Sequence, residues 1–272
     1  MSRGGRGRRR RGFADLASAT DAAAAGDDGQ GLHVLARFAG ARGEIRVLEE
    51  ATTGARHYEE GGITQSRVLP GGEAGVAYVR LMAELLDRGG AVLLLGCGGG
   101  ALATMLHRRG CRVTVVEANP LSFHLARTFF WMPGGIECIV ADMRELAAPP
   151  AGSIGGIGID VGGPQFSYED VITAAAIARL RGSLREGGRI AVNISLEAPD
   201  DPVPGRIADR LAAEGLEVWA FNEHPVSDEL NVVLLATAGR EEVAALARLT
   251  GEGWSLARLA GSDGRRRGAR SA

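Results

Sequence analysis

A glycine-rich turn and a downstream acid carry the clearest chemistry in this sequence. Residues 91–103, AVLLLGCGGGALA, lead from an apolar strand into the turn, and Glu117 ends the next apolar strand, RVTVVE. Glycines remove side chains where backbone must approach a ligand, and a helix begins just beyond them. An acid about 20 residues later is placed to accept hydrogen bonds from ribose hydroxyls. The spacing predicts a pocket for an adenosine-type cofactor.

Two further acids follow later strands. Asp142 comes after ECIVA, and Asp160 ends IGGIGI. Ligands of parallel sheets bind beyond the carboxyl ends of the strands, so these acids and Glu117 are expected at one edge. Asp142 would accept from an adenine amine, and Asp160 would orient or deprotonate an incoming amine. Because acids are also common at turns and helix N-caps, capping is the alternative for each, as for Asp142 before MRELA.

The elements that position these acids alternate between strand and helix. The pattern predicts helices at 73–88, 100–109, 119–130, 168–184 and 203–214, and strands at 91–95, 112–116, 136–140, 156–160 and 188–194. Such alternation is typical of a parallel sheet covered on both faces. The last two strands, LEVWAF and LNVVLLAT, are joined too closely for a crossover helix and should pair antiparallel. The predicted fold is α/β, a doubly wound, mostly parallel, seven-stranded sheet.

Four regions are expected along the chain. Residues 1–30 form a disordered basic tail, and residues 31–70 form an antiparallel annex of two hairpins. Residues 71–250 form the Rossmann-like nucleoside-binding domain, and residues 251–272 form a C-terminal tail. The Arg-rich start, MSRGGRGRRRRG, is interpreted as a solvated tail, with a nucleic-acid contact as the alternative.

Composition excludes several classes of function. All basic residues are arginines, so Schiff-base chemistry, a Walker lysine and a Tyr-x-x-x-Lys dehydrogenase dyad are ruled out. The three cysteines form no CxxC motif, and no His/Cys cluster has the spacing of a metal site, so no metal is expected. No stretch reaches the roughly 20 apolar residues of a membrane span. Reduced cysteines and the absence of an export signal predict a cytoplasmic protein.

The order of these motifs resembles that of the spermidine synthase (polyamine aminopropyltransferase) family. The resemblance runs from GGITQSRVLPGGEAGVAYVRLM through VLLLGCGGG, VVEANP and IVADM to IDVGGP, over roughly residues 43–237. It implies a β-annex followed by a class I methyltransferase-like fold. It also implies aminopropyl transfer from decarboxylated S-adenosylmethionine to a small amine, by an enzyme that is a homodimer.

The resemblance also assigns roles to individual positions. Glu117 matches the ribose acid, Asp142 the adenine-side acid and Asp160 the catalytic aspartate. Further cofactor contacts are implied for Gly96, Cys97, Gly98, Gly100, Ala118 and Met143, and substrate contacts for Gln65, Tyr78, Gly163 and Pro164.

The sequence departs from the family pattern at three positions, two of which belong to the amine half of the pocket. Gly99 replaces the aspartate that would hold the aminopropyl ammonium, Gly163 replaces a second aspartate that anchors the amine, and Gly43 replaces a glutamine. Loss of two charge-assisted hydrogen bonds, each worth about 1.5–3 kcal/mol, weakens recognition of cationic substrates. Intact S-adenosylmethionine and methyl transfer are therefore one alternative. A non-catalytic nucleoside-binding relative and an NAD-dependent oxidoreductase are the others.

Overall fold

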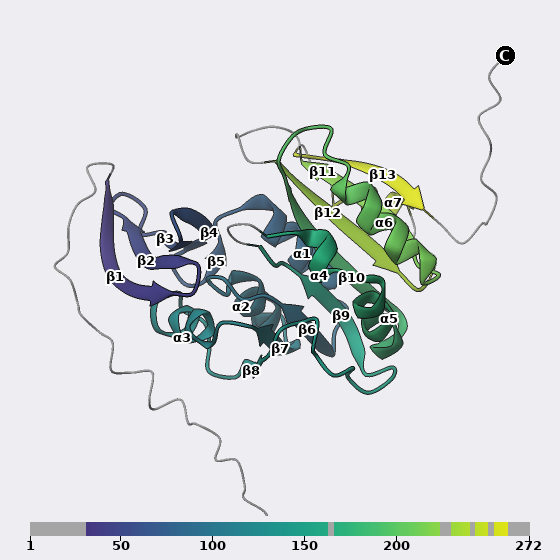
Figure 1. Ribbon diagram of the computed structural model, residues 1–272, viewed down its shortest axis with the longest axis horizontal. Helices are drawn as coiled ribbons and strands as arrows, with labels where there is room; N and C mark the ends of the chain where they lie inside the picture. The colour runs from purple at the N-terminus through teal and green to yellow at the C-terminus, as the bar shows by residue number, and fades with distance from the viewer. Residues whose placement is uncertain (1–30, 163–165, 224–229, 240–242, 250–252, 261–272) are drawn as a thin grey trace, which may run out of the picture.

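The computed structural model describes residues 31–162, 166–223, 230–239, 243–249 and 253–260. A small N-terminal sheet (purple and blue) lies next to a larger sheet that is covered by helices (Figure 1). The predicted basic tail at 1–30 lies outside the described residues, as do two predicted substrate-binding residues, Gly163 and Pro164.

The N-terminal sheet, here called the annex, is an antiparallel meander. Its strands are β1 (Leu32–Gly40), β2 (Gly43–Glu50), β3 (Arg56–Glu60), β4 (Ile63–Leu69) and β5 (Glu73–Ala74). The first hairpin closes through the two-residue turn 41–42, where Gly43 has a φ of 124°, which favours glycine. The sequence predicts two hairpins ending at residue 70. The structure adds β5, which pairs with β4 and leads into the first helix.

The larger sheet has the order β13-β11-β12-β10-β9-β6-β7-β8. Its parallel strands are β6 (Ala91–Leu95), β7 (Arg112–Glu117), β8 (Glu137–Val140), β9 (Ile154–Ile159) and β10 (Leu184–Leu196). The chain runs outward from β6 to β8 and then returns to the other side of β6 as β9. Strand order therefore reverses between β6 and β9, the position where ligands of such sheets bind.

Three antiparallel strands complete this sheet: β11 (Glu217–Glu223), β12 (Leu230–Thr237) and β13 (Trp254–Ala260). The predicted antiparallel pairing of the last two predicted strands is confirmed. The predictions of seven strands and of a tail from residue 251 are wrong, because residues 254–260 form an eighth strand beside β11. An edge strand can carry charge, and Arg258 pairs with Glu217 at 2.7 Å.

Seven helices are described. They are α1 (Ala77–Leu86), α2 (Ala101–Arg108), α3 (Pro120–Phe129), α4 (Tyr168–Val171), α5 (Ala174–Ser183), α6 (Val203–Ala213) and α7 (Val243–Ala247). The predicted helix 168–184 is two helices, because Ser167 and Thr173 each accept a backbone N–H as an N-cap. The segment MRELA, which Asp142 would cap in the alternative interpretation, begins with a turn at residues 143–145. None of the described helices is long and apolar enough to cross a bilayer.

Alternation along the strands divides the core between the two faces of the sheet. Val92 and Leu94 of β6 pack on the face covered by α1, α2 and α3, whereas Leu93 and Leu95 pack on the face covered by α5 and α6. The predicted parallel sheet buried on both faces is therefore confirmed.

The annex shares the first of these two cores. Tyr58 of β3 is buried, and its hydroxyl hydrogen-bonds Ser122 Oγ at 2.9 Å. Its ring meets the fully buried Phe130 edge to face, with centroids 6.4 Å apart. Burial raises the pKa of Tyr58 to about 12, so the hydroxyl stays neutral. These contacts fix the annex against the face of the larger sheet that is covered by α1, α2 and α3.

We predict that Phe130→Ala lowers the free energy of unfolding by about 3–5 kcal/mol, because it opens a cavity between the annex and the sheet. Urea denaturation measures the change. Phe130→Leu, which retains most of the volume, is the matched control and should lose clearly less stability. Equal stability of the alanine variant and the wild type would contradict the shared core.

Candidate active site

Asp160 lies directly after β9, with its carboxylate held by two side chains. Asn193 Nδ2 of β10 donates to Asp160 Oδ1 at 3.0 Å, and the Tyr78 hydroxyl of α1 donates a second hydrogen bond. Burial raises the pKa of Asp160 to about 6, against the opposing effect of these hydrogen bonds. At pH 7 the group is thus mostly ionised but close to its titration range, as suits a group that exchanges protons.

Close packing brings Tyr78 and the glycine turn to Asp160. A Cβ on Gly158 of β9 would lie 2.7 Å from Leu94 and 3.0 Å from Leu86 of α1, so glycine lets α1 approach the sheet. A Cβ on Gly96 would lie 2.0 Å from the Asp160 carbonyl oxygen. The backbone of the turn and that of the acid are therefore in direct contact.

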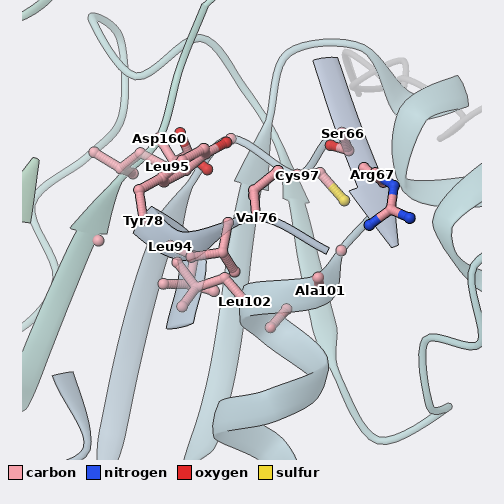
Figure 2. Close-up of a pocket in the computed structure, with 15 residues that line it drawn as sticks. Ser66, Arg67, Val76, Tyr78, Leu94, Leu95, Cys97, Ala101, Leu102 and Asp160 are labelled. Atoms are coloured by element: carbon pink, nitrogen blue, oxygen red, sulfur yellow. The ribbon is translucent and has the colours of Figure 1, made fainter. Parts of the chain in front are cut away.

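A pocket extends from Asp160 to the annex (Figure 2). Its lining includes Ser66 and Arg67 of β4, Val76 and Tyr78 at the start of α1, and the turn residues Gly96, Cys97 and Gly100. Figure 2 shows Asp160 and Tyr78 at one end of this pocket and Ser66 and Arg67 at the other. Five predicted site residues, Tyr78, Gly96, Cys97, Gly100 and Asp160, therefore meet at one pocket.

Glu117 ends β7 on the other side of the turn. Its carboxylate accepts from the backbone N–H of Cys97 at 3.0 Å and from that of Asn119 at 2.7 Å. Burial raises its pKa, and these hydrogen bonds together with the nearby Arg42 charge oppose the rise. The side chain is half-buried, and each carboxylate oxygen can accept a further hydrogen bond. Its position at the tip of β7 suits a diol ligand.

The glycines of the turn pack against protein on the annex side. Gly99 N–H donates to Ser66 Oγ at 2.9 Å, and a Cβ on Gly98 would lie 2.3 Å from that oxygen. A Cβ on Gly99 would meet Val68 at 2.7 Å and Phe130 at 3.2 Å. Side chains of the annex and Phe130 therefore fill the direction of the missing Cβ of Gly99, so a larger side chain does not fit at this position.

Asp142 is paired with Arg144, two residues further along the chain. Its carboxylate accepts from the Arg144 backbone N–H at 2.8 Å and from the Arg144 guanidinium at 3.0 and 2.6 Å. These bonds hold the pKa of Asp142 below its usual value. The acid stabilises a turn, as the capping alternative expects, and an adenine amine would share it with Arg144. Met143 is buried in the core, and Ala118 is exposed.

Three residues of the site, Ser66, Arg67 and Asn193, were not predicted from the sequence. Gln65 is half-buried on β4, but its neighbours Ser66 and Arg67 line the pocket instead. Asn193 is buried within a strand, where a polar residue among Ile, Ala and Val was the available signal. Among the described residues no group of three His, Cys, Asp or Glu side chains is arranged to hold a metal ion.

Comparisons with known proteins agree with this geometry. A methyltransferase-domain family profile matches residues 93–192, whereas a search of curated proteins found no match. The crystal structure of a probable spermidine synthase from Corynebacterium glutamicum superposes with a TM-score of 0.72 at 17% identity, covering 87% of this chain and 97% of that one.

Two further spermidine synthase structures align with this chain. One, solved in complex with the transition state analogue AdoDATO, gives a TM-score of 0.62 at 15% identity. The other, from Thermotoga maritima, gives 0.59 at 17% identity, and each alignment covers 78% of this chain and 75% of the other. The chain therefore has the spermidine synthase-like form of the class I S-adenosylmethionine-dependent transferase fold.

Proposed function

We propose that this chain is a transferase that binds a sulfonium derivative of adenosine and transfers an alkyl group to a small amine. The observation that carries the proposal is the Asp160 carboxylate, held by Tyr78 and Asn193 at the end of a pocket that the glycine turn lines. Ligands of this fold bind at that place in the sheet, where strand order reverses.

The residues at the strand tips fit an adenosine cofactor. Glu117 would hold the ribose hydroxyls, and the backbone at Gly96 and Cys97 would border the 5′ substituent. Asp142 and Ala118 would contact the adenine side, with Asp142 still paired to Arg144. When bound, the sulfonium group supplies an electrophilic carbon, and its sulfur keeps the electron pair of the broken bond as a neutral thioether.

Asp160 would act on the acceptor amine. A carboxylate attracts the amine as an ammonium and accepts its proton as the nitrogen lone pair becomes the nucleophile. Tyr78 and Asn193 would keep the carboxylate pointed at the amine, and this fixed geometry supplies much of the rate enhancement.

Two alkyl groups are supported by different observations. Similarity to spermidine synthases and the presence of Asp160 favour an aminopropyl group from decarboxylated S-adenosylmethionine. The methyltransferase-domain match and glycine at position 99 favour a methyl group from intact S-adenosylmethionine. Mass spectrometry of the products distinguishes them, because aminopropyl transfer releases methylthioadenosine and methyl transfer releases S-adenosylhomocysteine. The homodimer and the cytoplasmic location stay predictions.

We predict that Glu117→Ala weakens methylthioadenosine binding by at least about 10-fold, because one lost hydrogen bond to a charged group is worth about 1.5–3 kcal/mol. Isothermal titration calorimetry measures the affinity. Glu137→Ala, which changes an exposed acid on the neighbouring strand, is the control and should bind normally. Unchanged affinity of the Glu117 variant would reject the ribose assignment.

We predict that Asp160→Asn reduces turnover by at least about 100-fold while methylthioadenosine affinity stays within about twofold, because the amide cannot accept the proton. Steady-state kinetics and calorimetry on the same preparation separate the two effects. Asp87→Asn, a change at a half-buried acid that follows α1 and does not line the pocket, is the matched control. An Asp160→Asn enzyme with full turnover would remove this residue as the base.

We predict that kcat/KM falls as pH decreases through about 6, because only the ionised form of Asp160 can accept a proton. Since the pKa is raised, the active carboxylate predominates above this value and is lost below it. Initial rates between pH 5 and 8 in buffers of constant ionic strength test the profile. An acid limb that stays near pH 4 would mean that the titrating group is not Asp160.

A further inference from the structure

One arginine of the annex reaches across to the catalytic side of the sheet. Arg42 lies in the two-residue turn between β1 and β2, and its Nη1 donates to the carbonyl oxygen of Gly162 at 3.0 Å. Gly162 follows Asp160 by two residues, although it is 120 residues from Arg42 in the sequence. The tight hairpin turn therefore presents a cation to the strand end that carries the proposed base.

Two interactions connect this cation with the strand ends on either side of the glycine turn. β6 lies between β9 and β7 in the sheet. The guanidinium hydrogen-bonds the chain that follows β9, and its charge opposes the burial that raises the pKa of Glu117 at the end of β7. Arg42 thus lies near the tip of β6. A nucleoside held by Glu117 would extend its 5′ substituent past this point toward Asp160.

The charge of Arg42 is incompletely neutralised. Arg42 forms an ion pair with the buried Glu60, whose Oε2 lies 3.7 Å from Arg42 Nε, beyond hydrogen-bond distance. Apart from the bond to Gly162, the guanidinium donors have no hydrogen-bond partner among the described residues, and the side chain is 42% exposed. An arginine in this state can accept an anionic ligand in a bidentate manner.

The other arginine near the pocket differs in this respect. Arg67 donates to both carboxylate oxygens of Glu50, at 2.7 and 2.9 Å. The hydrogen bonds from Arg67 help to lower the pKa of Glu50 to about 2, so the pair stays ionised and its charges cancel. Arg42 is therefore the better candidate for an anion.

We propose that Arg42 binds the carboxylate of intact S-adenosylmethionine and so selects the cofactor against its decarboxylated form. This inference rests on the proposed function and specifies its co-substrate. The decarboxylated cofactor ends in an ammonium group, which the guanidinium would repel, and Gly99 supplies no acid to offset that repulsion. The intact cofactor carries the carboxylate that Arg42 would pair with.

The proposal narrows the reaction. A carboxylate-bearing cofactor can give a methyl group, leaving S-adenosylhomocysteine, or a 3-amino-3-carboxypropyl group, leaving methylthioadenosine. In both cases the amine nitrogen forms the new C–N bond, sulfur keeps the electron pair of the broken C–S bond, and Asp160 takes the proton. Simple aminopropyl transfer would be disfavoured.

The test is a binding comparison of three nucleosides that need no turnover. The full-length wild type, Arg42→Gln and Arg42→Lys are titrated calorimetrically with S-adenosylhomocysteine, decarboxylated S-adenosylhomocysteine and methylthioadenosine. Arg37→Gln is the matched control, because Arg37 lies on the same hairpin in a surface ion pair with Glu44 at 2.7 Å. The ratio of affinities between ligands is the readout, since any effect through Glu117 or the fold changes all three alike.

We expect Arg42→Gln to weaken the binding of S-adenosylhomocysteine by about 10- to 100-fold, the effect of losing one charge-assisted hydrogen bond. Methylthioadenosine should change by less than about twofold, the decarboxylated ligand should bind no worse, and Arg42→Lys should be intermediate. Equal weakening of all three ligands, or unchanged S-adenosylhomocysteine affinity, overturns the role of Arg42 and leaves the proposed function standing. Failure of the wild type to bind any of the three overturns both.

Discussion

Contact between the annex and the glycine turn is the constraint on which the site depends. Ser66 accepts a hydrogen bond from the backbone of Gly99, and Val68 and Phe130 occupy the space where a side chain at 99 would lie. Because β4 rests directly on the turn, Ser66 and Arg67 line the pocket that contains Asp160. A larger residue in the turn would push the annex away and separate the two halves of the pocket.

Asp160 shows how packing sets chemistry in this fold. Burial disfavours its charged form, and the hydrogen bonds from Asn193 and Tyr78 favour it. The result is a carboxylate that is ionised at neutral pH and that can still take up a proton at a slightly lower pH. Tyr78 reaches this acid because glycines in β9 allow α1 to lie close to the sheet. The close packing of α1 on the sheet therefore also helps to set the pKa of Asp160.

Charges of both signs lie along the strand tips. Carboxylates stand at the ends of β7 and β9, and the guanidinium of Arg42 hydrogen-bonds the chain that follows β9, while its charge opposes the rise in the pKa of Glu117. In water such charges would be weakly coupled, but at a partly buried site each affects its neighbours and any ligand between them. A zwitterionic tail matches this alternation of charge, whereas a purely cationic tail places like charges together near Arg42.

Local sequence patterns were sufficient to predict much of the secondary structure and two of the site residues. Hydrophobic periodicity predicts the strands from β6 to β12 and most helices, and strand ends locate Glu117 and Asp160, because these features depend on residues close in sequence. Contacts between distant segments were not predictable. Ser66 meets Gly99 across 33 positions and Arg42 meets Gly162 across 120, and β13 exists because β11 offers it an edge. Hydrophobic periodicity does not show which distant segments will pack together. The packing of annex side chains on the glycine turn and the contact of Arg42 with Gly162 are therefore decided only by the tertiary structure.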